Sequence, residues 1–272
     1  MLKDMTLGQY FPGASLLHRL DPRMKIIIMT IFITVIFMAS NVITISAVFL
    51  MNILLVLLSQ INLKVILRGI RPLVFIITFT AAINVLWTPG ENILVQFRLI
   101  FWLITVTAEG VVYAVMMVMR LVTLVTSASI LISYTTSPTA FTDALERLLG
   151  PLKKIKAPVH EFSMMMMIAL RFIPSLIDET DKIINAQKAR GADFYSGSLI
   201  KRAKALIPIL IPLIVSAFRR ADELATAMEC RCYNGGEGRT KMKQLRLAPR
   251  DFIAFGVTAV LSAGVIVLRR FT

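Results

Sequence analysis

Long apolar runs separated by short polar segments follow one another along most of the chain. At 1.5 Å per residue, a helix needs about 20 residues to cross a hydrocarbon core of about 30 Å. The runs close to this length are Ile26–Ala39, Val42–Leu58, Pro72–Trp87, Gly110–Tyr134 and Phe252–Leu268. Only Ser40 and Asn41 separate the first two, which predicts a tight helical hairpin. The pattern therefore predicts an all-α polytopic membrane helix bundle of about five spans.

A further apolar segment, Ile93–Val106, has three interpretations: a further crossing, a re-entrant piece, or an apolar hairpin on the outer face. If it crossed, residues 135–250 would lie opposite the cationic N-terminus. Lys153, Lys154 and Arg250 lie near the ends of that region, and basic residues are enriched in cytoplasmic loops. We therefore expect 93–106 to lie outside or to be only partly inserted, and the N-terminus to be cytoplasmic.

Residues 135–248 are rich in charge and are expected to form a cytosolic-side domain between the spans of 1–134 and the last span in 249–272. Three helices are expected there, from Pro138 to about Leu149, from Pro158 towards Gln187, and from about Ser198 to Tyr233. Gly191 is well placed to stop the second helix. Pro208 and Pro212 interrupt the short apolar part of the third, which predicts a kinked helix along the membrane surface or packed on protein. A short, tilted transmembrane helix is the alternative.

Composition supports a membrane protein. The chain is 57% hydrophobic with a mean hydropathy of +0.75, whereas soluble domains are about 45–50% apolar. The net charge of +14 fits the positive-inside bias better than nucleic-acid binding, because the apolar runs are so long. We expect a multi-pass protein of the cell membrane, in contact with lipid and without a nucleic-acid partner.

No residue pattern indicates catalysis, a metal or a cofactor. The glycine-rich string from Gly235 to Thr240 lacks the spacing of a phosphate-binding loop. Glu229, Cys230 and Cys232 have no suitably spaced fourth donor for a metal. We therefore expect no enzyme activity in the chain itself.

Two ionisable residues, Glu109 and Arg120, fall within or beside a predicted span. Such residues are functional candidates, but we favour Glu109 at the outer interface and Arg120 paired with a neighbouring helix. Four consecutive methionines are candidates for an adaptable contact surface or for ordinary packing. They are Met164, Met165, Met166 and Met167.

Two arginines are expected at the ends of the long charged helices, in Ala189-Arg190-Gly191 and in Cys230-Arg231-Cys232. The helix dipole favours a cation at a C-terminus by about 0.3–1 kcal/mol, which alone could explain both. An arginine at a helix tip on a cytosolic surface also suits recognition of a carboxylate on a partner.

Several strings together resemble one known family. They are Tyr10–Gly13 (YFPG), Ser15–Lys25 (SLLHRLDPRMK), Glu109-Gly110, Arg120, Thr135–Pro138 (TTSP), Ala189–Gly191 (ARG), and Ala227–Glu229 (AME) followed by Arg231. The chain is similar over essentially its whole length to EcfT, the transmembrane coupling subunit of energy-coupling factor transporters, the CbiQ-like family.

This resemblance implies a membrane bundle with a cytosolic-side coupling domain of long crossing helices. It implies that Arg190 and Arg231 dock into two ABC-type ATPase subunits. A separate substrate-binding S component would rest on the coupling helices, with Met164–Met167, Pro208 and Pro212 as candidate contacts. The family usually has Gly where Cys232 stands. We therefore expect the second helix end to differ in shape, or the two ATPase contacts to be unequal.

The predicted function is thus the coupling subunit of an ATP-driven importer of a vitamin or metal ion, with ATP hydrolysis in partner subunits. The alternatives are a self-contained membrane carrier or enzyme, and a scaffold without ATPase partners. No residue selects the transported substrate.

Overall fold

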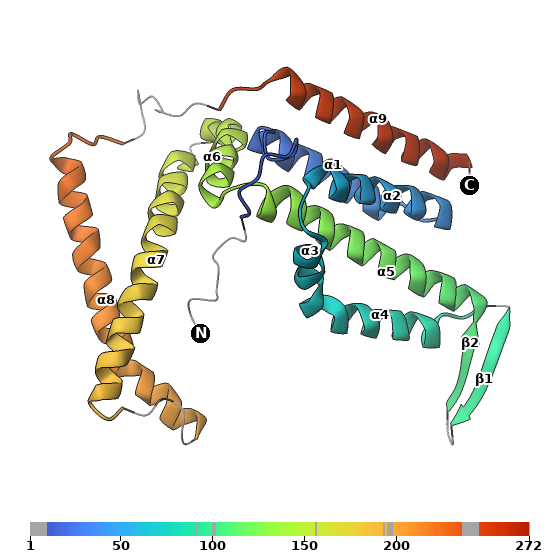
Figure 1. Cartoon of the computed structure of the whole chain (residues 1–272), viewed down its shortest axis with the longest axis horizontal. Coiled ribbons are helices and arrows are strands. Elements are labelled where there is room, and N and C mark those ends of the chain that lie inside the picture. Colours follow the sequence, from blue (N-terminus) through green and yellow to red (C-terminus); the bar gives the residue numbers. More distant parts are fainter. Residues whose placement is uncertain are drawn as a thin grey trace. The chain divides into compact units, whose positions relative to one another are not determined.

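The computed structural model describes residues 10–90, 92–99, 102–155, 157–192, 194, 198–235 and 245–271. Helices dominate, in agreement with the predicted all-α class (Figure 1). The elements are α1 (Pro22–Met38), α2 (Val42–Ser59), α3 (Leu63–Ile70), a 3₁₀ turn (Arg71–Leu73), α4 (Val74–Trp87), β1 (Ile93–Leu99), β2 (Trp102–Thr107), α5 (Ala108–Ala128), a π-helical turn (Ser129–Tyr134), α6 (Pro138–Leu148), a 3₁₀ turn (Gly150–Ile155), α7 (Val159–Ala189), α8 (Leu199–Glu229) and α9 (Pro249–Phe271). The glycine-rich segment from Gly236 to Thr240 lies outside the described residues.

The chain packs as two compact units. One contains the described residues of Leu145–Gln244, and the other those of Gly8–Ala144 and Leu245–Thr272. We call them the charged unit and the spanning unit. The three predicted segments, 1–134, 135–248 and 249–272, depend on where the membrane lies, and they stay a prediction.

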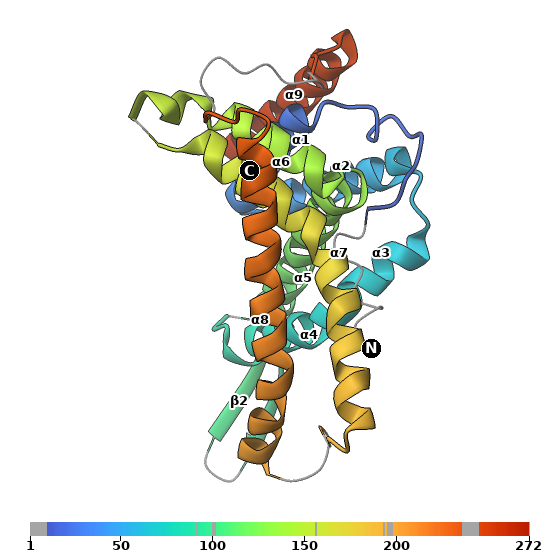
Figure 2. The same cartoon turned by 90° about the vertical axis from the view of Figure 1, so that its left-hand side faces the viewer.

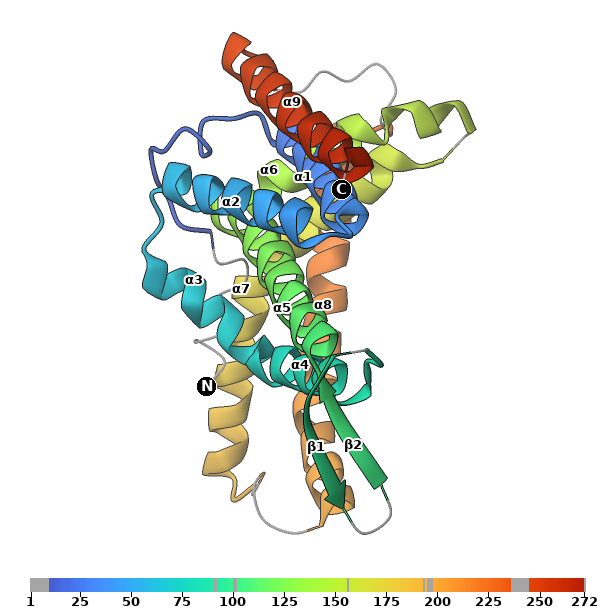
Figure 3. The same cartoon turned by 90° about the vertical axis from the view of Figure 1, so that its right-hand side faces the viewer.

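In the spanning unit, the helices lie in layers in the order α9, then α1 with α2, then α5, then α4 (Figure 1). Figure 3 shows α1 and α2 between α9 and α5. The core between them is apolar: Phe32 and Ile36 on α1 are fully buried, in a cluster with Ile45 of α2 and Val265 of α9. The opposite faces remain exposed and apolar, which is the distribution expected when lipid replaces water as the solvent.

Among the described residues, five helical segments are long and apolar enough to cross a membrane: Val42–Ser59, Leu63–Trp87, Ala108–Tyr134, Val159–Ala189 and Pro249–Phe271. Four of these contain a predicted span. The predicted span Ile26–Ala39 overlaps α1, which ends at Met38, has only 17 residues and is shorter than the five. Val159–Ala189 is the fifth segment and has the lowest mean hydropathy of the five, 1.2. We expected this helix on the cytosolic side, and that location stays a prediction.

The ambiguous apolar segment is a β-hairpin, so it does not form a further transmembrane helix. Strands β1 and β2 pair antiparallel, with Leu99 opposite Trp102 (Figure 3). The sequence of the two strands is rich in β-branched and aromatic residues, which favour strands over helices. Its position relative to the membrane stays a prediction.

The N-terminal segment Ser15–Lys25, one of the strings that resemble the family, connects distant parts of the spanning unit. The Lys25 ammonium is buried and donates to the Thr135 carbonyl (2.7 Å) and to the hydroxyls of Thr135 (3.1 Å) and Thr136 (3.2 Å). The buried Asp251 carboxylate accepts the Asp21 N–H (2.8 Å). The starts of α1 and α9 and the end of the π-helical turn are therefore joined by buried hydrogen bonds.

Arg120 and Gly110, two residues of the resembling strings, have structural roles on α5. The Arg120 guanidinium donates to the Ala39 carbonyl, at the C-terminus of α1. This confirms the interpretation that Arg120 pairs with a neighbouring helix, at the helix end where a cation is favoured. A Cβ on Gly110 would lie 3.1 Å from the Asn84 carbonyl oxygen, so glycine allows α4 to approach α5 closely.

Candidate functional site

The first candidate helix end is the C-terminus of α7. Gly191 has φ +83°, in the left-handed region that glycine enters without a steric penalty. Its N–H donates to the Lys188 carbonyl (2.9 Å), and the Ala192 N–H donates to the Gln187 carbonyl (3.0 Å). This pair of bonds is a Schellman motif. The prediction that Gly191 stops this helix is confirmed, and Arg190 is the last residue before the chain reverses.

The C-terminus of α8 closes in the same way. Cys232 has φ +57°; its N–H donates to the Glu229 carbonyl (2.8 Å), and the Tyr233 N–H donates to the Met228 carbonyl (3.0 Å). The spacing equals that at α7, so Arg231 takes the position of Arg190. The expected difference in shape is therefore wrong for the backbone. Cys232 adopts the conformation that glycine adopts at α7, at a cost of about 1–2 kcal/mol for its Cβ.

Both helix ends present their predicted contact residues to the surroundings. Exposed are Ala189, Arg190, Gly191, Cys230, Arg231 and Cys232. Within the described part of the chain, neither guanidinium has a hydrogen-bond or ion-pair partner. The helix dipole accounts for a cation at these ends, but it leaves the guanidinium N–H donors available. Such donors bind carboxylates in a bidentate manner.

Polar contacts fix α7 against α8. Arg220 on α8 forms an ion pair with Glu179 and donates to the Ser175 hydroxyl, both on α7. The Gln187 side-chain amide donates to the Pro208 carbonyl (3.4 Å). These pairs show that the helices are antiparallel. Figure 1 shows the two helices crossing, with their ends apart on both sides of the crossing, and Figure 2 also shows them apart at one end.

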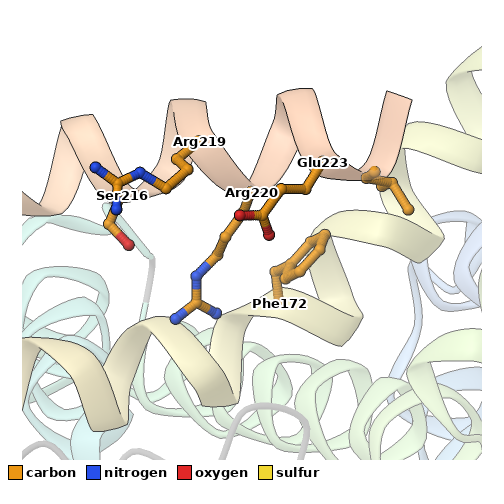
Figure 4. A pocket seen from close by; sticks show the side chains of 6 residues that line it. Phe172, Ser216, Arg219, Arg220 and Glu223 are labelled. Atoms are coloured by element: carbon orange, nitrogen blue, oxygen red, sulfur yellow. The ribbon is translucent and has the colours of Figure 1, made fainter. Parts of the chain in front are cut away.

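Phe172 on α7 and residues 216–224 on α8 line an open surface pocket of about 540 Å³. Figure 4 shows the Arg220 side chain pointing from α8 towards α7, beside Phe172, whereas the Arg219 guanidinium stays along α8. Two neighbouring arginines therefore have different roles: Arg220 braces the crossing, and Arg219 does not contact Glu179.

The antiparallel arrangement places Arg190 and Arg231 at opposite ends of the helix pair. Each helix has 31 residues, which corresponds to about 46 Å. Pro208 and Pro212 lie in the part of α8 near the Arg190 end, and both are exposed. Figure 1 shows α8 bent in this N-terminal part, as prolines inside a helix cause.

The methionines lie towards the other end of the pair. Met165 and Met166 are exposed, whereas Met164 and Met167 are half-buried. Met165 and the Pro208 contact at Gln187 are separated by about 33 Å along α7. The structure therefore does not gather the methionines and the two prolines into one patch.

Sequence reasoning missed the brace formed by Ser175, Glu179 and Arg220. The only local signal is the pair Arg219-Arg220, which follows the apolar part of α8. Nothing in the sequence says which of the two points at α7, because that depends on how the helices cross.

The fold and the two helix ends define a polytopic, mainly helical membrane protein that carries a pair of long crossing helices with exposed arginines at their tips. Residues 13–242 match the family model described as "Cobalt transport protein", CbiQ. The chain belongs to this family, and the curated relatives that follow are energy-coupling factor transporter transmembrane proteins.

Three such relatives cover nearly the whole chain, and each has the name "Energy-coupling factor transporter transmembrane protein EcfT". The protein of Ruminiclostridium cellulolyticum is 51% identical over 98% of both chains. That of Thermosediminibacter oceani is 47% identical over 98% of this chain and 99% of its own. The Bacillus subtilis protein is 44% identical over 99% of this chain and 100% of its own. The chain is therefore a transmembrane transport component of the energy-coupling factor type.

Proposed function

We propose that the chain couples two ABC-type ATPase subunits to a substrate-binding S component in a micronutrient importer. The charged unit lies on the cytosolic side, as does the N-terminus. Arg190 and Arg231 each dock on one ATPase subunit. ATP-driven movement of the ATPases is transmitted through α7 and α8 to the S component. The chain itself hydrolyses no ATP.

One observation carries this proposal: two helix ends with the same closing hydrogen bonds each present an exposed arginine without a partner in the described chain. A single cation at a helix end could serve the dipole alone. The same geometry twice, at opposite ends of one braced helix pair, supports two similar contacts. A pair of ATPase subunits provides two such contacts.

The surface of α8 supports an apolar membrane partner. Between Leu206 and Phe218 its exposed large apolar side chains are Leu206, Ile207, Leu210, Ile211, Ile214, Val215 and Phe218. An exposed apolar surface of this size marks a protein or lipid contact. We assign it, with Pro208 and Pro212, to the S component, and Met165 and Met166 to the same partner at the other end of the helix pair.

The test is co-purification in mild detergent after expression with the ATPases and an S component of a related transporter. We expect Arg190→Glu with Arg231→Glu to abolish ATPase recovery and substrate uptake, because the reversed charge repels a carboxylate. The control is Arg171→Glu with Arg219→Glu, which makes the same charge change at exposed sites on the same two helices. The control should retain both.

Normal ATPase recovery with the reversed tips would refute the proposal. So would substrate uptake by vesicles that contain this chain alone, because that result would establish a self-contained carrier.

A further inference from the structure

A cavity of about 460 Å³ opens on the spanning unit, and none of its lining residues is assigned to coupling. It is lined by α1, α2, α9, the segment before α1 and Leu131 of the π-helical turn. Its buried floor includes Leu17, Leu20 and Ile28, and exposed side chains such as Leu54 and Val257 line it as well. Apart from Arg250 and Thr258, the lining is apolar, and the Thr258 hydroxyl already donates to the Ala254 carbonyl (2.8 Å).

The cavity is a groove along one face of α9. Its α9 lining residues are Arg250, Ile253, Ala254, Val257, Thr258 and Leu261, which follow the three- and four-residue spacing of one helix face. From Arg250 to Leu261 the groove extends about 16 Å. A hydrocarbon core is about 30 Å thick, so the groove has the depth of one leaflet.

Arg250 marks one end of the groove and is the only charged residue that lines it. It is the second residue of α9, where the helix dipole disfavours a cation. Its side chain is exposed, and it has no hydrogen-bond or ion-pair partner within the described ranges. Helix stability therefore does not explain the charge, whereas an anion at this end of the groove would.

We propose that this groove binds one anionic phospholipid, with an acyl chain along α9 and the phosphate at Arg250. A guanidinium pairs well with phosphate, and basic residues at the membrane surface attract anionic lipids. The size argues against a partner helix: a helix about 10 Å wide and 16 Å long would occupy about 1,200 Å³, more than the cavity holds. An acyl chain is narrow enough to enter from the bilayer.

The test uses the full-length protein in nanodiscs of phosphatidylcholine with an added fraction of phosphatidylglycerol. Lipids that stay bound after release into the gas phase are counted by native mass spectrometry. We expect one retained phosphatidylglycerol per wild-type chain. Arg250→Gln should lower its retention about fivefold relative to phosphatidylcholine, the effect expected for one basic residue at the membrane surface.

A second pair of variants tests the apolar part. Val257→Trp should fill the groove and abolish retention of the lipid. Val260→Trp makes the same change at an exposed residue of α9 that does not line the cavity, and it should have no effect. For the charge, Arg246→Gln is the matched control, because Arg246 is exposed and outside the lining.

Equal retention in Arg250→Gln and wild type would overturn the assignment of the phosphate. Equal retention in Val257→Trp and Val260→Trp would overturn the groove. Retention of phosphatidylcholine as strongly as phosphatidylglycerol would show a non-selective surface and would also refute the proposal. A protein that binds the wild-type chain but not the Val257→Trp variant would refute it as well, because that protein and not a lipid would occupy the groove.

Discussion

At the scale of single residues, Cys232 carries a conformational strain that its counterpart Gly191 avoids. Both lie in the left-handed region, at φ +57° and +83°, but only the cysteine has a Cβ that opposes it. Cys232→Gly should therefore stabilise the end of α8 by about 1 kcal/mol. Because such opening is local, the measurement is hydrogen exchange at the Tyr233 amide, which bonds to the Met228 carbonyl. Exchange should become slower.

The control for this substitution lies two residues earlier. Cys230 has φ −59°, where glycine gains no steric relief and only adds backbone freedom. Cys230→Gly should therefore accelerate the same exchange. If both substitutions act in the same direction, the strain at Cys232 is not the cause.

At the scale of elements, the contact between α7 and α8 depends on the half-buried Arg220–Glu179 ion pair. Arg220→Met with Glu179→Gln, measured as a double-mutant cycle of unfolding free energy, should give a coupling of about 1 kcal/mol. The control is a second cycle in which Arg219→Met takes the place of Arg220→Met, and it should show no coupling to Glu179→Gln. Equal coupling for both arginines would contradict the geometry of Figure 4.

At the scale of the whole molecule, the two tips should act together on a pair of ATPases. If both tips bind one ATPase pair, the second contact forms within the existing complex and raises the overall affinity by about 10²–10⁴. Arg190→Glu alone should therefore remove most of the affinity, as should Arg231→Glu alone, and the double variant should remove the rest. Affinity for purified ATPases on chains held in nanodiscs measures this. A single reversal with no effect would mean that only the other tip engages.

The sequence predicted those features that depend on neighbouring residues. Pro138 and Gly191 mark helix ends where we expected them. The paired arginine motifs and the resembling strings were equally visible, because each is a short run of adjacent residues.

Where sequence reasoning left alternatives open or was wrong, two local preferences competed or distant residues decided. Ile93–Val106 is apolar enough for a membrane segment, but its β-branched content gave a hairpin. Cys232 argued for a different helix end, yet its backbone follows the same hydrogen bonds as Gly191, because closing the carbonyls of α8 outweighs the cost of the Cβ.

The sequence by itself determined the membrane class, the helix ends at Pro138 and Gly191, the family and the two arginine motifs, since hydrophobic periodicity and capping act over a few residues. Only the tertiary structure decided that α7 and α8 run antiparallel and place Arg190 and Arg231 at opposite ends. It also decided which arginine braces the crossing and that Arg250 lies at the mouth of an apolar groove. These features arise from contacts between residues far apart in the chain, which no local pattern encodes.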